Sequence, residues 1–288
     1  MVQLENGCIQ VQIAEKGAEV QSVKSNGLEY MWRGDPAFWG KHSPVLFPIV
    51  GGLKNNTYTF QGKSYQLGRH GFARDTTFSV LENPKNGTVV FGMSDTAETK
   101  RSYPFSFRFL IRYTLKDNLL RTEYTVKNTD SQDMYFSVGA HPAFSVPLEK
   151  GLTFEDYALR FNKKENAPVY PLDDHGQTLV DPVPFLEDTD VLPLKKSLFH
   201  KDALVFKDLR STAISLTSEK GQHGLTVSFD GFPYMGIWNA KDADFVCIEP
   251  WKGIADNVDA TGDITKKEGI LSLPPGKLFS AGWSVAFF

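Results

Sequence analysis

The stretch FRFLIRYTLKDNLLRTEYTVKN, residues 107–128, alternates apolar and polar side chains on either side of a short polar turn. The odd positions from Phe107 to Leu115 are apolar or aromatic, and Arg108 and Arg112 lie between them. Successive side chains of a strand point to opposite faces, so this alternation predicts a strand with one buried face. The alternation resumes after residues 116–118, and two such runs around a polar turn predict a β-hairpin.

Similar alternation recurs along the rest of the chain. Further strands are predicted at residues 9–13, 19–25, 57–60, 88–93, 213–216, 225–229, 245–248 and 279–288. Asn-Gly pairs at 6–7, 26–27 and 86–87 and an Asp-Gly pair at 230–231 supply turns. No long window shows helical periodicity, so the sequence predicts an all-β antiparallel sandwich. The polar, proline-rich residues 166–193 are expected to form a surface excursion within one domain, residues 1–288.

Composition and charge narrow the function classes. The formal net charge is −3 and basic residues form no long run, which argues against nucleic acid or an anionic membrane surface as a partner. No stretch approaches the ~18 apolar residues of a membrane span. Cys8 and Cys247 lie far apart, and residues 1–7 do not begin a signal peptide, so we expect a cytoplasmic protein. The six histidines lack short metal-ligand spacing, which predicts no structural metal.

Three segments do not fit plain strands or turns. GRHGFARD (residues 68–75) puts His70 in a polar loop, and VGAHPAFSVP (residues 138–147) puts His141 at the end of an apolar run. FVCIEPW (residues 245–251) puts Glu249 on the same strand face as Phe245 and Cys247. A carboxylate on an apolar face must be paired, hydrogen-bonded or functional, because stranding it there costs several kcal/mol.

Each of these residues also has a structural interpretation. Glu249 could bind a backbone turn or an arginine such as Arg74, and His141 could be a hydrogen-bonded core histidine. His70 could serve only to shape its loop, and Asp202 could be a turn residue. The tryptophans at 32, 39, 238 and 251 are individually typical of core or rim positions.

Taken in order, these segments resemble the aldose 1-epimerase (galactose mutarotase) family, and within it the LacX-like and hexose-6-phosphate mutarotase-related proteins. The resemblance runs through FPIVGGLKNNTYTFQGKSYQL (47–67), RHGFAR (69–74), the hairpin with its leading Tyr-Pro (102–129), GAHPAF (139–144), KDALVF (201–206) and CIEPW (247–251). It implies a large antiparallel β-sandwich and an isomerase that interconverts the anomers of an aldohexose without metal or cofactor.

The resemblance also implies roles for individual residues. Glu249 would be the base at the anomeric oxygen O1, and His141 the acid at the ring oxygen O5. A nearby carboxylate such as Asp202 would favour the charged form of His141. The implied substrate-binding residues are His70, Asp202, Arg74, Lys54 and Trp251.

One position departs from the family pattern. Gly52 stands where many members carry an arginine beside the sugar, so Arg74 or Lys54 would have to replace that arginine. Arg69, Arg74 or Lys54 could also bind a phosphate, since arginine clamps phosphate through two hydrogen bonds. The sequence therefore leaves open which sugar is bound, whether it is phosphorylated, and whether the chain acts as a monomer or a homodimer.

Two other function classes remain. A non-catalytic carbohydrate-binding or sensing protein could use the same scaffold, since fold does not fix function. A glycoside hydrolase could use Asp202 and Glu249 as its carboxylate pair, about 5–9.5 Å apart. A histidine facing Glu249 across a site for one sugar ring would favour the mutarotase.

Overall fold

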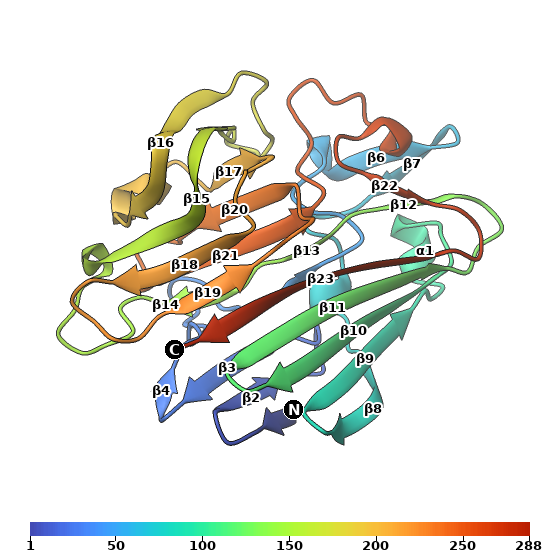
Figure 1. Ribbon diagram of the computed structural model, residues 1–288. Helices are drawn as coiled ribbons and strands as arrows, with labels where there is room; N and C mark the ends of the chain where they lie inside the picture. The colour runs from blue at the N-terminus through green and yellow to red at the C-terminus, as the bar shows by residue number, and fades with distance from the viewer.

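The computed structural model describes residues 1–288, apart from the side chain of Asn83. The largest sheet orders nine strands as β16 (Val183–Pro193), β15 (Tyr157–Val169), β18 (Ala213–Ser218), β19 (Leu225–Ser228), β23 (Leu278–Phe287), β11 (Leu119–Asn128), β10 (Phe107–Lys116), β9 (Thr88–Ser94) and β8 (Ser79–Lys85). Figure 1 shows β23, coloured red, between β19 and β11, so the end of the chain joins the two halves of this sheet.

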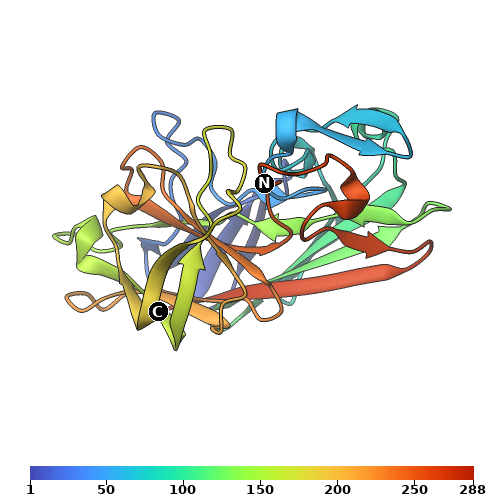
Figure 2. The ribbon, with the colours of Figure 1, turned by 90° about the horizontal axis from the view of Figure 1, so that it is seen from above.

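The other strands form smaller sheets. A six-stranded sheet orders β17 (Leu204–Lys207), β20 (Tyr234–Trp238), β21 (Phe245–Lys252), β13 (Val138–Ala140) and β5 (Val45–Leu46), and β14 (Ala143–Ser145) also pairs with β21. A four-stranded sheet contains β1 (Val2–Glu5), β2 (Ile9–Ile13), β3 (Val20–Ser25) and β4 (Leu28–Glu29). Two ribbons pair β6 (Thr57–Phe60) with β7 (Lys63–Gln66) and β12 (Met134–Phe136) with β22 (Leu271–Leu273). Figure 2 shows β23 along one side and the β6–β7 ribbon with nearby loops on the opposite side.

Helical segments in the described chain are short. They are α1 (Thr99–Ser102) and 3-10 turns at Lys54–Asn56, Ala73–Asp75, Phe154–Asp156, Lys196–Phe199 and Ile264–Lys266. None of the helices that the structure describes has the length and apolar character needed to cross a membrane. The predicted all-β antiparallel sandwich is therefore confirmed.

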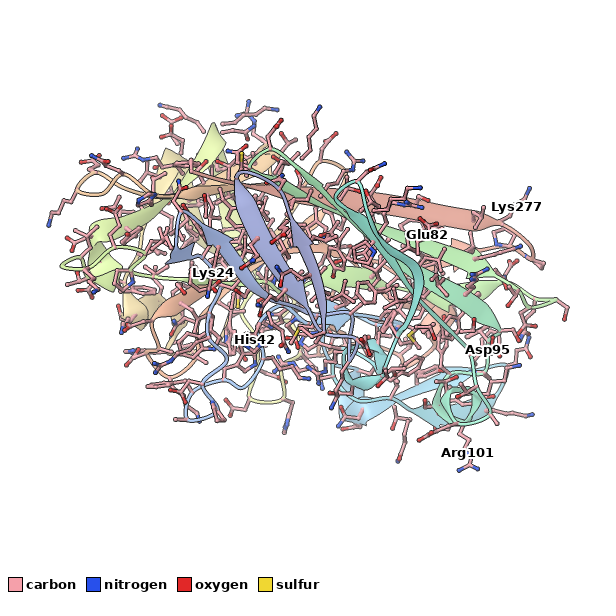
Figure 3. All side chains as sticks on the ribbon, turned by 90° about the horizontal axis from the view of Figure 1, so that it is seen from below. Lys24, His42, Glu82, Asp95, Arg101 and Lys277 are labelled. Atoms are coloured by element: carbon pink, nitrogen blue, oxygen red, sulfur yellow. The ribbon has the colours of Figure 1, made fainter. Side chains whose placement is uncertain are left out.

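The hairpin at residues 107–128 forms as the alternation predicts. Strands β10 and β11 pair antiparallel, with Ile111 opposite Tyr124, and every second residue of β10 is buried. These buried side chains enter the main core, where Phe47 stacks on Phe109 with ring centroids 4.4 Å apart. Phe47 directly follows β5, so the core anchors the segment that continues to Gly51 and Gly52. Figure 3 shows charged side chains such as Arg101 and Lys277 at the periphery.

The prediction that residues 166–193 form a surface excursion is wrong in part, because strands include both ends of this segment. Strand β15 continues to Val169, and β16 pairs with it as the outermost strand of the nine-stranded sheet. The register shifts between Arg160 and Val169 indicate bulges, and most of β16 is exposed or half-buried. An edge strand with little buried surface has no need for strict alternation, which explains why residues 183–193 show no strand pattern in the sequence.

Candidate active site

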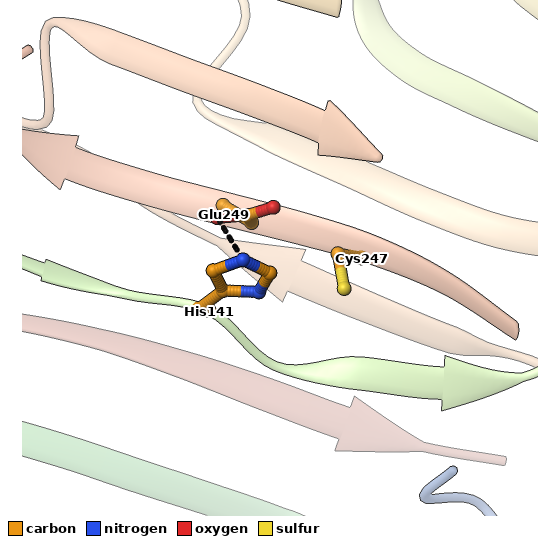
Figure 4. Close-up of side chains that lie close together, drawn as sticks. All are labelled: His141, Cys247 and Glu249. Carbon is orange, nitrogen blue, oxygen red and sulfur yellow. Dashed lines mark ion pairs between the residues drawn. The ribbon is translucent and has the colours of Figure 1, made fainter. Parts of the chain in front are cut away.

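Glu249 and His141 are brought together by strand pairing around β21. Gly139 on β13 pairs with Trp251, and Ala143 on β14 pairs with Cys247. These two registers place residue 141, in the break between β13 and β14, opposite residue 249. Figure 4 shows the imidazole facing the carboxylate, with Nε2 of His141 3.4 Å from Oε2 of Glu249.

The pair is almost completely buried and keeps hydrogen-bonding capacity free. Glu249 is 1% exposed and His141 is 8% exposed. Among the residues that the structure describes, Oε2 of Glu249 and Nδ1 of His141 have no hydrogen-bond partner. Buried polar atoms are normally paired, so free ones at the wall of a cavity are typical of groups that act on a ligand.

Burial disfavours the charged form of both partners. It raises the pKa of Glu249 well above its usual value, and Arg69 opposes this shift. Burial also lowers the pKa of His141 to about 3, with Arg74 and Arg69 acting in the same direction. Two groups this close titrate as a unit. Burial therefore favours the state in which the pair holds one proton over the states with none or two, because only that state carries no net charge.

A cavity of about 240 Å³ opens beside the pair and is lined by most of the residues predicted for the site. This volume lies below the ~300–1,000 Å³ typical of sites for drug-sized ligands, so it suits a ligand of one ring. Of the predicted residues, the lining includes Glu249, His141, His70, Asp202, Arg69, Arg74 and Trp251. The structure thus assembles in one place side chains that lie up to about 180 positions apart in the sequence.

His70 is held by the segment that follows Phe47. Its backbone has a positive φ of 68°, and its amide donates to the Gly51 carbonyl at 2.8 Å. Nδ1 of His70 accepts a hydrogen bond from the Gly51 amide at 3.1 Å, so the proton of the neutral ring lies on Nε2. Burial lowers the pKa of His70 well below its usual value, which keeps the ring neutral. His70 can therefore donate one hydrogen bond from Nε2.

Arg69 and Asp202 form a polar side of the cavity. Their charged groups lie 3.9 Å apart, and both side chains keep contact with solvent. Arg69 packs so closely over Gly176 that a Cβ atom there would lie 2.4 Å from its guanidinium. Arg74 also lines the cavity, and its buried Nε has no hydrogen-bond partner among the described residues. These two guanidinium groups can bind hydroxyls or an anionic substituent of a ligand.

Lys54 lies outside the cavity, although the sequence made it a candidate for binding. Its ammonium group donates to the Val258 carbonyl at 2.6 Å, which holds the side chain away from the ligand space. Gly52 has open space where a side chain would begin, since the nearest atoms are carbonyl oxygens 4.0 Å away. Arg69 and Arg74, and not Lys54, therefore supply the positive charge in this region.

The sequence did not identify several lining residues. Trp39 and Trp238 line the cavity, although each was expected to be a core or rim residue. Thr178 lines it too, from the segment expected to be only a surface excursion. A tryptophan such as Trp39 in a polar segment without strand periodicity was the available signal for a place in the site.

Comparison with known proteins agrees with this architecture. The family model for aldose 1-epimerase matches residues 1–272. The chromosomal protein LacX of Lactococcus lactis subsp. lactis is 34% identical over 285 residues, covering 95% of each chain. A galactose mutarotase related enzyme from Lactobacillus acidophilus is 40% identical, covers 99% of this chain and 96% of its own, and superposes with a TM-score of 0.95. A galactose mutarotase-like protein from Lactobacillus casei is 31% identical over the whole of both chains, with a TM-score of 0.94. The chain therefore belongs to the aldose 1-epimerase family.

Proposed function

We propose that this protein interconverts the α and β anomers of an aldohexose or hexose phosphate by acid–base opening of the sugar ring. The observation that carries the proposal is the buried pair of Glu249 and His141, 3.4 Å apart at the wall of a cavity for one ring. Ring opening needs one group that accepts a proton and one that donates a proton. A pair that shares one proton supplies both.

The proposed reaction moves two protons and breaks one bond. Glu249 removes the proton from O1 while His141 gives a proton to O5, and the C1–O5 bond breaks to leave an aldehyde at C1. Rotation about C1–C2 exposes the other face of the aldehyde, and the ring closes with both transfers reversed. His70 donates a hydrogen bond to the sugar from Nε2, and Asp202 accepts one from a hydroxyl. The reaction is an isomerisation, so no other reactant is consumed.

The two alternative functions fit the site less well. A glycoside hydrolase needs two carboxylates across the scissile bond, whereas a histidine faces Glu249. A binding protein needs no matched acid and base. Burying two groups that lack hydrogen-bond partners would lower the stability of such a protein without any benefit to binding. The arginines leave both neutral and phosphorylated sugars as candidate substrates, so the assay must include both.

The test is polarimetry of freshly dissolved α-D-glucose, α-D-galactose and glucose 6-phosphate. We expect the wild-type protein to speed the approach to anomeric equilibrium for at least one of them. His141→Asn should lower kcat by about 10²- to 10⁴-fold, because the amide is not an acid at O5. If the wild-type protein leaves all three rates at their spontaneous values, the mutarotase proposal fails and binding becomes the leading function.

The pH dependence should reflect the shared proton. Activity requires one proton on the pair. We therefore expect kcat/KM to fall at low pH only when a second proton binds, and at high pH only when the last proton leaves. Because burial lowers the pKa of His141 and raises that of Glu249, kcat/KM should stay level through neutral pH. A fall in kcat/KM with an inflection near the ordinary imidazole pKa of ~6.5 would contradict this. Rates must be extrapolated to zero buffer concentration, since buffers also catalyse mutarotation.

A further inference from the structure

We propose that Trp39 is a positioning residue that orients His141 by ring stacking and favours the cationic, protonated form of its imidazole. The inference rests on the mutarotase function proposed above, because a protonated His141 is the form that donates to O5. Trp39 lies in a loop without regular structure, outside the segments that carry Glu249 and His141.

Aromatic rings surround His141 on several sides. Trp39 stacks on the imidazole, with ring centroids 4.9 Å apart and an angle of 24° between the planes. Trp238 meets it edge to face at 5.4 Å and 90°, and His70 does so at 5.6 Å and 82°. These contacts restrict both the tilt and the rotation of the ring.

Ring packing takes the place of a hydrogen bond at Nδ1. A functional histidine is commonly oriented by a hydrogen bond from the ring nitrogen that does not react. Nδ1 of His141 has no such partner among the residues that the structure describes. The stacked indole of Trp39 is therefore the contact that fixes the plane of the imidazole while Nε2 faces Glu249.

Trp39 is itself held firmly by its neighbours. Its amide donates to the Asp35 carbonyl at 2.8 Å, and its carbonyl accepts a hydrogen bond from Nε1 of Trp32 at 2.8 Å. The indole also stacks near Phe245, with centroids 5.7 Å apart. Both hydrogen bonds use backbone atoms of Trp39, so a change of its side chain leaves them in place.

The charge of His141 depends on groups from several elements. Glu249 on β21 favours the imidazolium, whereas burial and the arginines 69 and 74 disfavour it. His70 is neutral, and the buried thiol of Cys247 on the same strand as Glu249 stays protonated because burial raises its pKa. A tryptophan face within ~6 Å of a cation stabilises it, and tryptophan is the best aromatic residue for this. Trp39 thus stabilises the imidazolium of His141 and opposes the effect of burial and the two arginines.

Replacing Trp39 by leucine separates two opposite effects. If the indole mainly stabilises the cation, its loss moves the shared proton from His141 to Glu249. If the indole mainly excludes water, its loss hydrates the pair and moves the proton toward His141, since hydration favours the charged form. The sign of the change therefore distinguishes the two roles.

The experiment is ¹⁵N NMR of histidine-labelled protein at neutral pH, with His141→Gln used to assign the His141 signals. We expect Trp39→Leu to shift these signals toward neutral imidazole and to lower kcat about tenfold with KM little changed. Trp39→Phe keeps a smaller aromatic face and should give an intermediate shift. Phe38→Leu is the matched control, because Phe38 is the neighbouring aromatic residue of the same loop and is 37% exposed.

Three results would overturn the inference. They are a wild-type His141 that is already wholly neutral, signals unchanged in both Trp39 variants, and a shift toward imidazolium in Trp39→Leu. The NMR result does not depend on turnover. A wild-type protein that fails in polarimetry refutes the proposed function, whereas unchanged ¹⁵N signals in an active Trp39→Leu protein refute the role of Trp39.

Discussion

Glu249→Gln should lower kcat for mutarotation by about 10³-fold while leaving the thermal stability equal or higher. Glutamine has nearly the shape of glutamate but cannot take the proton from O1. Burial already disfavours the carboxylate of Glu249, as its raised pKa indicates, so a neutral amide should be at least as stable there. The prediction combines a large loss of activity with no loss of stability, and polarimetry with thermal unfolding measures both.

A double variant provides the control for this prediction. In the proposed mechanism Glu249 and His141 act on one substrate as a unit, so Glu249→Gln combined with His141→Asn should be little slower than the slower single variant. Independent roles would instead make the two losses multiply. A Glu249→Gln protein that keeps activity within tenfold of wild type, or that unfolds far below it, would point to a structural carboxylate.

The sequence predicted the fold well where a strand has one buried and one exposed face. The hairpin of β10 and β11 is such a case, because the pleat of each strand turns alternate side chains from Phe107 onward toward the core and toward solvent. The edge strand β16 was missed since little of its surface is buried. Strand β21 is buried almost throughout, so Glu249 stood out as a charged residue among apolar ones.

Individual site residues were predictable where a polar side chain interrupts an apolar pattern, as Glu249 and His141 do. Their direct opposition was not, because it depends on the registers of β13 and β14 against β21. The position of Lys54 in the sequence predicted a binding role, but its ammonium group donates to the Val258 carbonyl and lies outside the cavity. The stacking of Trp39 on His141 joins a loop to a strand end, and no local pattern encodes that contact.

The sequence also gave no sign of the buried ion pair of Asp256 and Lys267 that supports the site. The ammonium of Lys267 lies 2.9 Å from Oδ1 of Asp256, and the two side chains are only 3% and 4% exposed. Lys267 also donates to the Ile254 carbonyl at 2.6 Å, and Oδ2 of Asp256 accepts from the Lys54 amide at 2.9 Å. The neighbouring residues Ile254 and Ala255 line the cavity, so this pair fixes part of its wall.

Asp256→Ala should lower the free energy of unfolding by about 3–5 kcal/mol, because it leaves the Lys267 ammonium buried without its counter-ion. The matched control is Glu219→Ala, which breaks an exposed pair with Arg160 of similar length, 2.8 Å. Exposed pairs contribute only about 0–1 kcal/mol, so this variant should unfold close to wild type.

Replacing both partners separates the cost of an unpaired charge from the value of the pair. Asp256→Leu with Lys267→Met removes both charges, so it should recover a large part of the stability lost in Asp256→Ala. Its KM should nevertheless rise, since the contacts of the pair with the Ile254 carbonyl and the Lys54 amide are lost and the cavity wall is no longer held. Urea unfolding and polarimetry measure the two effects separately. If Asp256→Ala is as stable as Glu219→Ala, the buried pair contributes nothing to holding the site. The wall formed by Ile254 and Ala255 must then depend on backbone contacts of its loop, such as the hydrogen bond from the Asp256 amide to the Gly52 carbonyl at 2.9 Å.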